Sequence, residues 1–145
     1  MRERFRPARS VLTFAQAGRL CKRMERVDAI SGGRPAYRLI EAGELTISSE
    51  VRGHAHLLAL SGDLDMATVR PFEDELRRVE ALSPEAIVVD LAALDYLDSH
   101  GATSLANAHR RARRDKRDFS VLQGAPHIHA SFELLGLDER LPFGS

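Results

Sequence analysis

Hydrophobic and polar residues alternate from Gly43 onward, and the alternation predicts two consecutive strands. Leu45 and Ile47 are separated by polar residues, as in a strand with one buried face. Residues 50–53 supply a turn, and residues 56–60 form the second apolar stretch. Because a connection of only a few residues joins antiparallel neighbours, we expect an antiparallel hairpin here.

Beyond the hairpin, the hydrophobic spacing switches between the helical and the strand period. Apolar residues three and four apart predict a helix over residues 68–82, and the apolar run 87–89 is typical of a strand buried on both faces. A helix over residues 101–114, a strand over 119–122 and a helix starting at Pro126 follow. The order β-β-α-β-α-β-α requires parallel pairing after the hairpin. We therefore expect an α/β fold: a mixed four- to five-stranded sheet, with an antiparallel first hairpin, then parallel strands, and helices packed on it.

Charge divides the chain into two pieces. Residues 1–40 carry ten basic and three acidic side chains, whereas residues 41–145 carry eleven basic and eighteen acidic ones. A Ser-Gly-Gly-Arg-Pro cluster at residues 31–35 marks the boundary. We expect a basic N-terminal extension over residues 1–40 and one domain over residues 41–145. A nucleic-acid-binding arm and a short amphipathic helix are alternatives for the extension. No aromatic platform accompanies its arginines, so we favour a flexible tail together with a translation start at Met24.

Overall composition narrows the class of protein. The chain is 43% hydrophobic and 29% charged, as in a globular protein. No window approaches the ~20 apolar residues of a membrane span, and the arginine-rich start lacks the pattern of a secretory signal. Cys21 is the only cysteine, so no internal disulfide can form. We expect a cytoplasmic protein.

The stretch Asp98-Ser99-His100 places an acid, a hydroxyl and an imidazole side by side. A hydrolase needs its nucleophile and base to meet side chain to side chain, and such residues are usually distant in sequence. The Gly-x-Ser-x-Gly elbow of many serine hydrolases does not surround Ser99. We therefore expect no catalytic residues and no enzymatic activity.

Two further clusters could bind ligands. His127 and His129 could hold a metal ion with His109, but side chains two apart on a helix point apart, and we expect neither a third ligand nor a carboxylate at useful spacing. The basic run 110–117 is interleaved with acidic residues and lacks a stacking aromatic. Solvent-facing histidines and a solvated helix end are the simpler interpretations. We expect no metal, no cofactor and no direct contact with nucleic acid.

Asp98 and Ser99 also suit the start of a helix. Both are good N-cap residues, because their side-chain oxygens accept hydrogen bonds from the free N–H groups of the first turn. This role alone would explain them. An exposed hydroxyl at the positive end of a helix can also carry a phosphate without unfolding anything.

The segment VVDLAALDYLDSHGATSLANAHRRAR resembles the signature of the STAS domain family, which includes the anti-sigma factor antagonists of bacteria. In that family an apolar strand ending in Asp precedes Asp-Ser-Ser-Gly at the start of a helix. Here the strand is expected to end in Asp90, and the motif reads Asp98-Ser99-His100-Gly101. Gly62-Asp63-Leu64-Asp65 resembles the family's Gly-Glu-Leu-Asp turn, and residues 132–138 resemble its C-terminal helix and cap. The resemblance covers residues 43–143.

The resemblance implies a partner-switching mechanism. The unphosphorylated antagonist binds an anti-sigma factor with serine kinase activity and so releases a sigma factor. The kinase phosphorylates the serine after the motif's Asp, and a PP2C-type phosphatase reverses the reaction. By position, the phosphorylated residue is Ser99, and the expected partner-binding residues are Asp65, Asp98, Ser99, His100 and Gly101. The alternative is a STAS scaffold or transporter-associated subunit that is not regulated by phosphorylation.

His100 departs from the family pattern, which has a second serine at this place. The substitution leaves one hydroxyl as phosphoacceptor but puts a larger side chain on the docking surface. It implies either altered kinase recognition or a member that is no longer phosphorylated.

Overall fold

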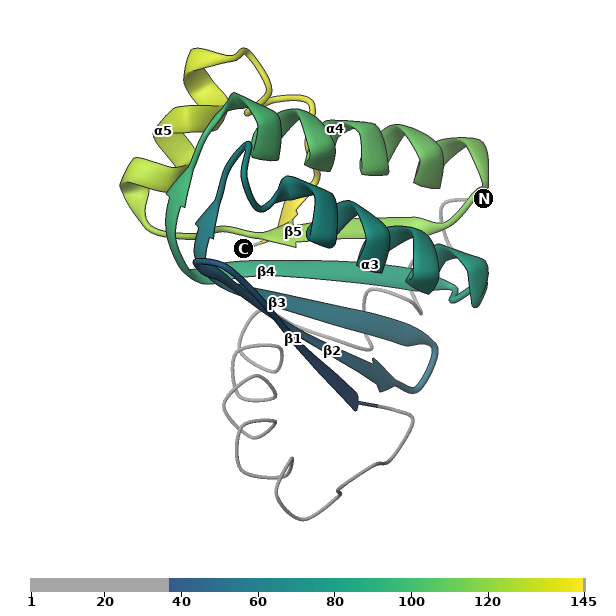
Figure 1. Ribbon diagram of the computed structural model, residues 1–145. Coiled ribbons are helices and arrows are strands. Elements are labelled where there is room, and N and C mark those ends of the chain that lie inside the picture. Colours follow the sequence, from purple (N-terminus) through teal and green to yellow (C-terminus); the bar gives the residue numbers. More distant parts are fainter. Residues whose placement is uncertain (1–36, 145) are drawn as a thin grey trace.

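A mixed six-stranded sheet carries the helices on one face (Figure 1). The computed structural model describes residues 37–144. The strands are β1 (Tyr37–Ala42), β2 (Leu45–Arg52), β3 (Ala55–Leu64), β4 (Ala86–Leu97), β5 (Asp118–Leu122) and β6 (Phe143–Gly144). The helices are α3 (Val69–Ala81), α4 (Ser99–Arg114) and α5 (Pro126–Leu134). The strands lie in chain order, antiparallel from β1 to β3 and parallel from β3 to β6. The expected fold class is confirmed; the sheet has six strands where four or five were expected, and β1 and β6 are the ones that the hydrophobic pattern did not indicate.

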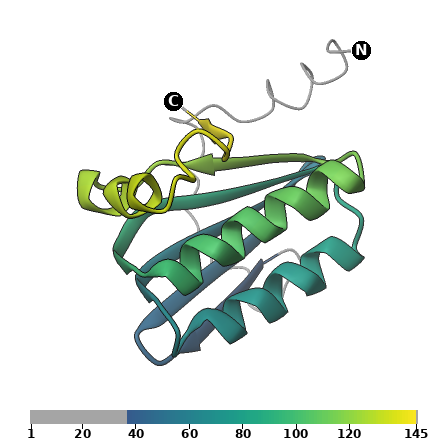
Figure 2. The same ribbon diagram turned by 90° about the horizontal axis from the view of Figure 1, so that it is seen from above.

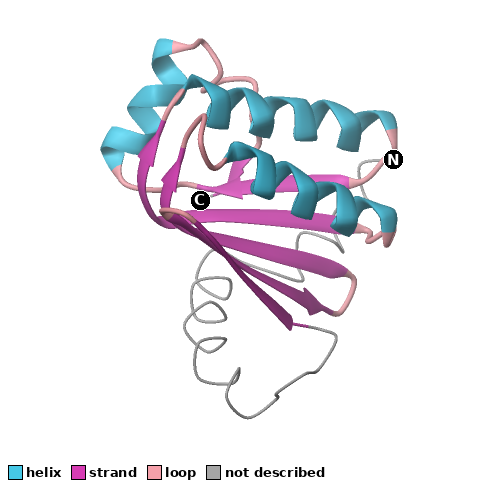
Figure 3. Ribbon diagram, in the orientation of Figure 1, coloured by secondary structure: helices cyan, strands magenta, loops and turns pink. Residues whose placement is uncertain are grey.

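Helices α3 and α4 lie side by side across the sheet, and both begin beside the C-terminal ends of β3 and β4 (Figures 1 and 2). Helix α5 lies at the same end of the sheet and contacts both β4 and α4. Colouring by secondary structure separates the strand layer from the helix layer (Figure 3). Among residues 37–144, no helix combines the length and the apolar character that a membrane span requires.

The core lies between the sheet and this helix layer. Apolar residues spaced three and four apart put Phe72, Leu76 and Val79 on the buried side of α3, where each has 0% exposure. They belong to one cluster with strand residues such as Leu58 and Val89. Burying one such side chain completely contributes about 1.5–3 kcal/mol. The buried core therefore fixes the positions of the helix N-termini, independently of the exposed side chains at those N-termini.

A buried polar cluster interrupts this core between β2, β3 and α3. His56 and Glu75 are each only 3% exposed, and Ser49 Oγ lies 2.7 Å from His56 Nε2. Arg78 binds Glu75 with two hydrogen bonds of 3.0 and 2.7 Å. Burial and the Arg78 cation lower the pKa of His56 to about 4, although Glu75 acts in the opposite direction. His56 is therefore neutral in the folded protein at pH 7.

Strand β1 differs from the sequence-based expectation. Residues 37–40, which we assigned to the N-terminal extension, pair antiparallel with β2. Their burial does not alternate, because β1 is an edge strand with several exposed side chains, and its hydrophobic pattern is correspondingly weak. Residues 1–36 lie outside the described residues, so the rest of the extension stays a prediction.

The hairpin turn and β4 also have different lengths from those expected. Strand β2 continues to Arg52, so the turn consists of Gly53 and His54 alone, with Gly53 at φ +60°. Strand β4 does not end at Asp90, whose buried carboxylate accepts a hydrogen bond of 2.9 Å from the backbone N–H of Ala92. A continued β4 matters for the site, because it pairs with β3 up to the C-terminal ends of both strands.

Candidate functional site

Asp98 connects the end of β4 to the start of α4. It is the N-cap of α4, and its Oδ1 accepts hydrogen bonds from the backbone N–H groups of His100 (2.9 Å) and Gly101 (3.1 Å). Its own N–H donates to the carbonyl oxygen of Leu64, at 3.2 Å. The predicted helix start is confirmed, and the capping role has a direct geometric basis.

The second carboxylate oxygen of Asp98 reaches the other helix start. Oδ2 accepts a hydrogen bond of 3.1 Å from the N–H of Met66, which lies 32 residues earlier in the turn before α3. Burial raises the pKa of Asp98, but the hydrogen bonds from the backbone of Gly101, Met66 and His100 outweigh it and hold the pKa below its ordinary value. One ionised carboxylate therefore ties the first turn of α4 to the turn that precedes α3.

Asp65 shapes the turn that precedes α3. Its Oδ1 accepts hydrogen bonds from the N–H groups of Ala67 (3.0 Å) and Thr68 (3.2 Å). The Thr68 hydroxyl, which is buried, donates to the carbonyl oxygen of Asp63 at 2.8 Å and accepts from the Asp65 N–H at 3.0 Å. Asp65 thus has a structural role, and its carboxylate lies next in sequence to Met66, which Asp98 binds.

Two glycines of the motifs are required by close packing. A Cβ atom at Gly101 would lie 2.8 Å from the Leu64 carbonyl oxygen and from Leu97 Cδ1, so the first turn of α4 sits directly against the ends of β3 and β4. At Gly62, φ is +94° and a Cβ would collide with the backbone oxygen of Glu44. Gly101 is buried, so it lets the first turn of α4 pack closely beneath the predicted site, and its role in partner binding stays a prediction.

The exposed parts of Asp65, Met66, Asp98, Ser99 and His100 form what we call the entry surface, because both helices enter the helix layer there. Ser99 is the exposed first residue of α4, and its hydroxyl has no hydrogen bond among the described residues. The Met66 side chain is 67% exposed. Sequence reasoning missed Met66, although a methionine directly after the Gly-Asp-Leu-Asp turn was the available signal.

The entry surface does not contain a hydrolytic nucleophile with its base. His100 Nδ1 lies 3.5 Å from Asp98 Oδ2. Within residues 37–144, no hydrogen bond joins the Ser99 hydroxyl to a histidine. A serine nucleophile requires that contact, so adjacency in sequence has not produced a triad here.

The surroundings of the two α5 histidines, His127 and His129, agree only in part with the expectation that both face solvent without a carboxylate nearby. His127 is exposed, and its Nε2 lies 2.7 Å from the Asp95 carbonyl oxygen. His129 is partly buried, and Glu133, four residues later, brings Oε2 to 3.7 Å from its Nε2, so a carboxylate does sit at useful spacing. With Asp138, these two side chains place their ligand atoms within 4.8 Å of one another. The other ring nitrogen of His129 is buried without a partner among the described residues, unlike in most metal-bound histidines. We therefore do not assign a metal centre.

Comparison with known proteins agrees with this geometry. The family model described as "Mlab, STAS domain" matches residues 47–142. The anti-sigma-F factor antagonist RsfB of Mycobacterium tuberculosis is 26% identical over 95 residues, which cover 66% of this chain and 77% of RsfB.

Solved structures show the same arrangement of strands and helices. The crystal structure of an anti-sigma factor antagonist from Mycobacterium paratuberculosis is 29% identical with a TM-score of 0.65, and the match covers 72% of this chain and 90% of that one. The phosphorylated form of the Bacillus cell fate determinant SpoIIAA is 17% identical with a TM-score of 0.53, covering 76% of this chain and 92% of SpoIIAA. The second likeness concerns the fold alone.

Proposed function

The chain belongs to the STAS domain family, and on this premise we propose that it is an anti-sigma factor antagonist acting in the bacterial cytoplasm. In the unphosphorylated state it binds an anti-sigma factor with serine kinase activity and so releases a sigma factor. Phosphorylation of Ser99 ends this binding, and a PP2C-type phosphatase restores it. The protein is a ligand and a substrate in this scheme, not an enzyme.

The observation that carries the proposal is the contrast between Asp98 and Ser99. Asp98 is committed to the fold by three hydrogen bonds from backbone N–H groups. Ser99 is exposed, and its hydroxyl is not used by any described residue. A kinase can therefore reach this hydroxyl without opening the helix, and removing the hydroxyl does not disturb the cap.

A phosphate on Ser99 would change the charge of the entry surface more than the fold. It brings about −1.5 to −2 charges at neutral pH. The N–H groups of His100 and Gly101 are already bound to Asp98, so the first turn of α4 has little left to neutralise the new charge. The phosphate would therefore stay hydrated beside the Asp98 carboxylate. A partner surface complementary to the unphosphorylated state would then meet a bulky dianion, and like charges across an interface cost several kcal/mol.

The named relatives support the antagonist function. RsfB is named an anti-sigma-F factor antagonist, and the structure from Mycobacterium paratuberculosis is described as an anti-sigma factor antagonist. SpoIIAA, a protein with this fold, has been solved in a phosphorylated form. The kinase and the phosphatase follow from the family resemblance of the motif at residues 98–101.

Phosphorylation assays with purified proteins test the proposal. The full chain is incubated with ATP and candidate anti-sigma factor kinases, and mass spectrometry locates the phosphate. We expect label on Ser99, its loss in Ser99→Ala, and its removal by a PP2C-type phosphatase. Thr103→Ala is the matched control, because Thr103 is an exposed hydroxyl on the same helix. Equal labelling of Ser99→Ala and the parent would contradict the assignment.

A STAS scaffold or transporter-associated subunit is the second candidate, because the description of the matching family model names a STAS domain and no sigma-factor role. In that role, the entry surface would bind a constant partner and Ser99 would not be phosphorylated. Affinity capture with the purified chain separates the two functions. An ATP-binding serine kinase as the captured partner supports the antagonist, and transporter or scaffold subunits support the alternative.

A further inference from the structure

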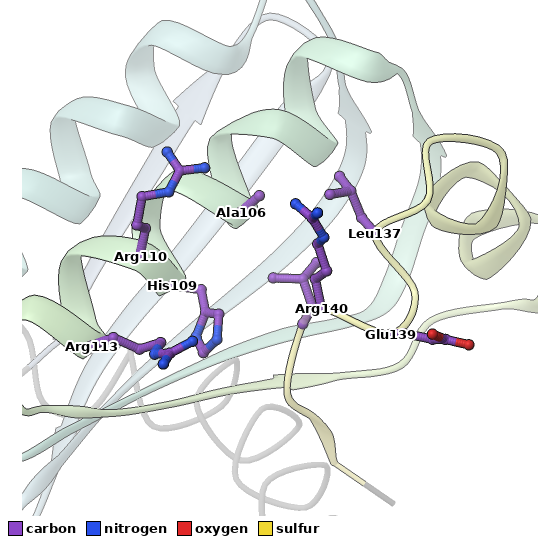
Figure 4. A pocket seen from close by; sticks show the side chains of 8 residues that line it. Ala106, His109, Arg110, Arg113, Leu137, Glu139 and Arg140 are labelled. Atoms are coloured by element: carbon purple, nitrogen blue, oxygen red, sulfur yellow. The ribbon is translucent and has the colours of Figure 1, made fainter.

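A pocket of about 370 Å³ lies between the C-terminal half of α4 and the segment that follows α5 (Figure 4). Arg110 and Arg113 come from α4, and Arg140 comes from the later segment. Apolar side chains, including Leu137, line another part of the wall. The pocket therefore combines three cations from two separate segments with an apolar surface.

The other arginines near the end of α4 already have acidic partners. Arg111 binds Glu80 of α3, with Nη2 and Oε2 3.1 Å apart. Arg114 binds the adjacent Asp115, with Nε and Oδ1 3.1 Å apart. These two arginines of the basic run 110–117 therefore behave as expected for a solvated helix end, with their charges balanced by nearby carboxylates.

The pocket arginines lack such compensation. Arg110 donates a hydrogen bond of 2.9 Å to the side-chain oxygen of Asn107, which is neutral. Among the residues that the structure describes, neither Arg113 nor Arg140 forms an ion pair. Among the described arginines of this region, those without an acidic partner are therefore the ones that line the pocket.

The only acidic side chain in the pocket lining does not neutralise them. Glu139 points away from the three guanidinium groups, whereas Arg113 extends toward His109 (Figure 4). Burial, followed by the Arg113 cation, lowers the pKa of His109. The neutral imidazole packs against Phe119 with ring centroids 5.9 Å apart and adds no further charge. The local charge is thus strongly positive with no internal counterion.

We propose that this pocket binds a small phosphate monoester, with Arg113 and Arg140 contacting the phosphate and the Leu137 side of the pocket contacting its organic part, while Arg110, which turns its guanidinium group toward Asn107, adds positive charge at the rim. A guanidinium group presents paired N–H donors that match two phosphate oxygens. The volume lies within the range of small-molecule sites, about 300–1,000 Å³.

This site is separate from the entry surface. Ser99 begins α4, whereas Arg113 lies next to its last residue. The anion site therefore does not depend on the proposed phosphorylation of Ser99, and either can fail without the other. A ligand held here would join α4 to the segment after α5.

Titration calorimetry with the full chain tests the site, with phenyl phosphate as the probe. We expect saturable binding that is tighter than that of inorganic phosphate, which lacks an apolar part, and tighter than that of benzoate, which has a carboxylate instead. Arg113→Ala and Arg140→Ala should each weaken binding by about tenfold or more, equivalent to ~1.4 kcal/mol. Arg77→Ala is the control, because Arg77 is an exposed arginine of α3 outside the pocket and its loss changes the net charge equally. It should leave the affinity within about twofold.

Three results would overturn the proposal. The first is the absence of saturable binding of phenyl phosphate at millimolar concentration. The second is an equal loss of affinity in Arg77→Ala and Arg113→Ala, which would show a general charge effect. The third is benzoate binding as tightly as phenyl phosphate, which would exclude a phosphate-specific site. All variants change exposed residues, and a thermal melt checks that each is folded.

Discussion

Replacing Asp98 by alanine tests whether one carboxylate holds both helix starts. The change removes the acceptor for the N–H groups of His100, Gly101 and Met66. Loss of an N-cap costs about 0.5–2 kcal/mol. The hydrogen bond from Met66 adds about 1.5 kcal/mol, the lower end of the range for a charged acceptor, because water can partly replace Asp98 as the partner of this exposed N–H group. We expect the free energy of unfolding to fall by about 2–3.5 kcal/mol, a large share of a typical domain's 5–15 kcal/mol.

Replacement by asparagine separates the charge from the cap. Asparagine caps a helix about as well as aspartate, but it has one acceptor oxygen and no charge, so it can keep the cap of α4 while it loses the bond from Met66. We expect a loss of about 1.5 kcal/mol at pH 7. The pKa of Asp98 is lowered in the folded protein, so the stability that its charge contributes is complete above the unfolded pKa and disappears as pH falls through the folded pKa. The stability difference between the parent and Asp98→Asn should therefore shrink as pH falls from about 5 towards 2.

Urea unfolding followed by circular dichroism measures both effects. Ser99→Ala is the control at the neighbouring position, because the Ser99 hydroxyl bonds to none of the described residues, and its unfolding free energy should change by no more than about 0.5 kcal/mol. A loss below about 0.5 kcal/mol in Asp98→Ala would refute the capping argument. A pH-independent difference between the parent and Asp98→Asn would refute the role of the charge.

Three further predictions concern the buried histidine, the motif glycine and the acidic turn. His56 binds a proton more readily when unfolded, so stability should rise between pH 4 and 6.5, by up to about 3 kcal/mol, and His56→Gln should flatten this rise in urea titrations. Gly62→Ala should lower the free energy of unfolding by more than about 3 kcal/mol in thermal melts, because the added Cβ would collide with backbone atoms. Gly53→Ala, which has open space around it, should lower it by only about 1–2 kcal/mol. Equal losses in the two variants would contradict the packing argument. Asp65→Ala should lower the free energy of unfolding by about 0.5–2 kcal/mol and should weaken partner binding by a larger free energy than that. Unchanged binding by the folded variant would show that Asp65 is not part of the docking surface.

The hydrophobic pattern predicted the elements that have a regular period. The helix expected over residues 68–82 is α3, and the strand expected over 119–122 is β5. The pattern failed where burial is irregular. In β4, Leu91, Leu94 and Leu97 are buried at every third position, because β3 and β4 pair with register shifts, so no strand period of two is visible there.

Contacts between segments far apart in the sequence could not be predicted from local sequence patterns. The sequence indicated Asp98 as a helix cap, but the bond from Met66 across 32 residues depends on β3 and β4 ending together. The arginines of α4 likewise look like a solvated helix end until Arg140 joins them from the segment after α5. Side-chain type and spacing predicted local roles, whereas the sheet topology determines which of these residues meet.

The affinity of the chain for its anti-sigma factor, with and without phosphate on Ser99, tests the proposed switch most directly. Calorimetry with the purified partner should show binding at least about 100-fold weaker for the phosphorylated chain, equivalent to ~2.7 kcal/mol, while the circular dichroism spectrum stays unchanged. Ser99→Ala should bind as tightly as the unphosphorylated parent. Equal affinity of the phosphorylated and unphosphorylated chains would contradict the account.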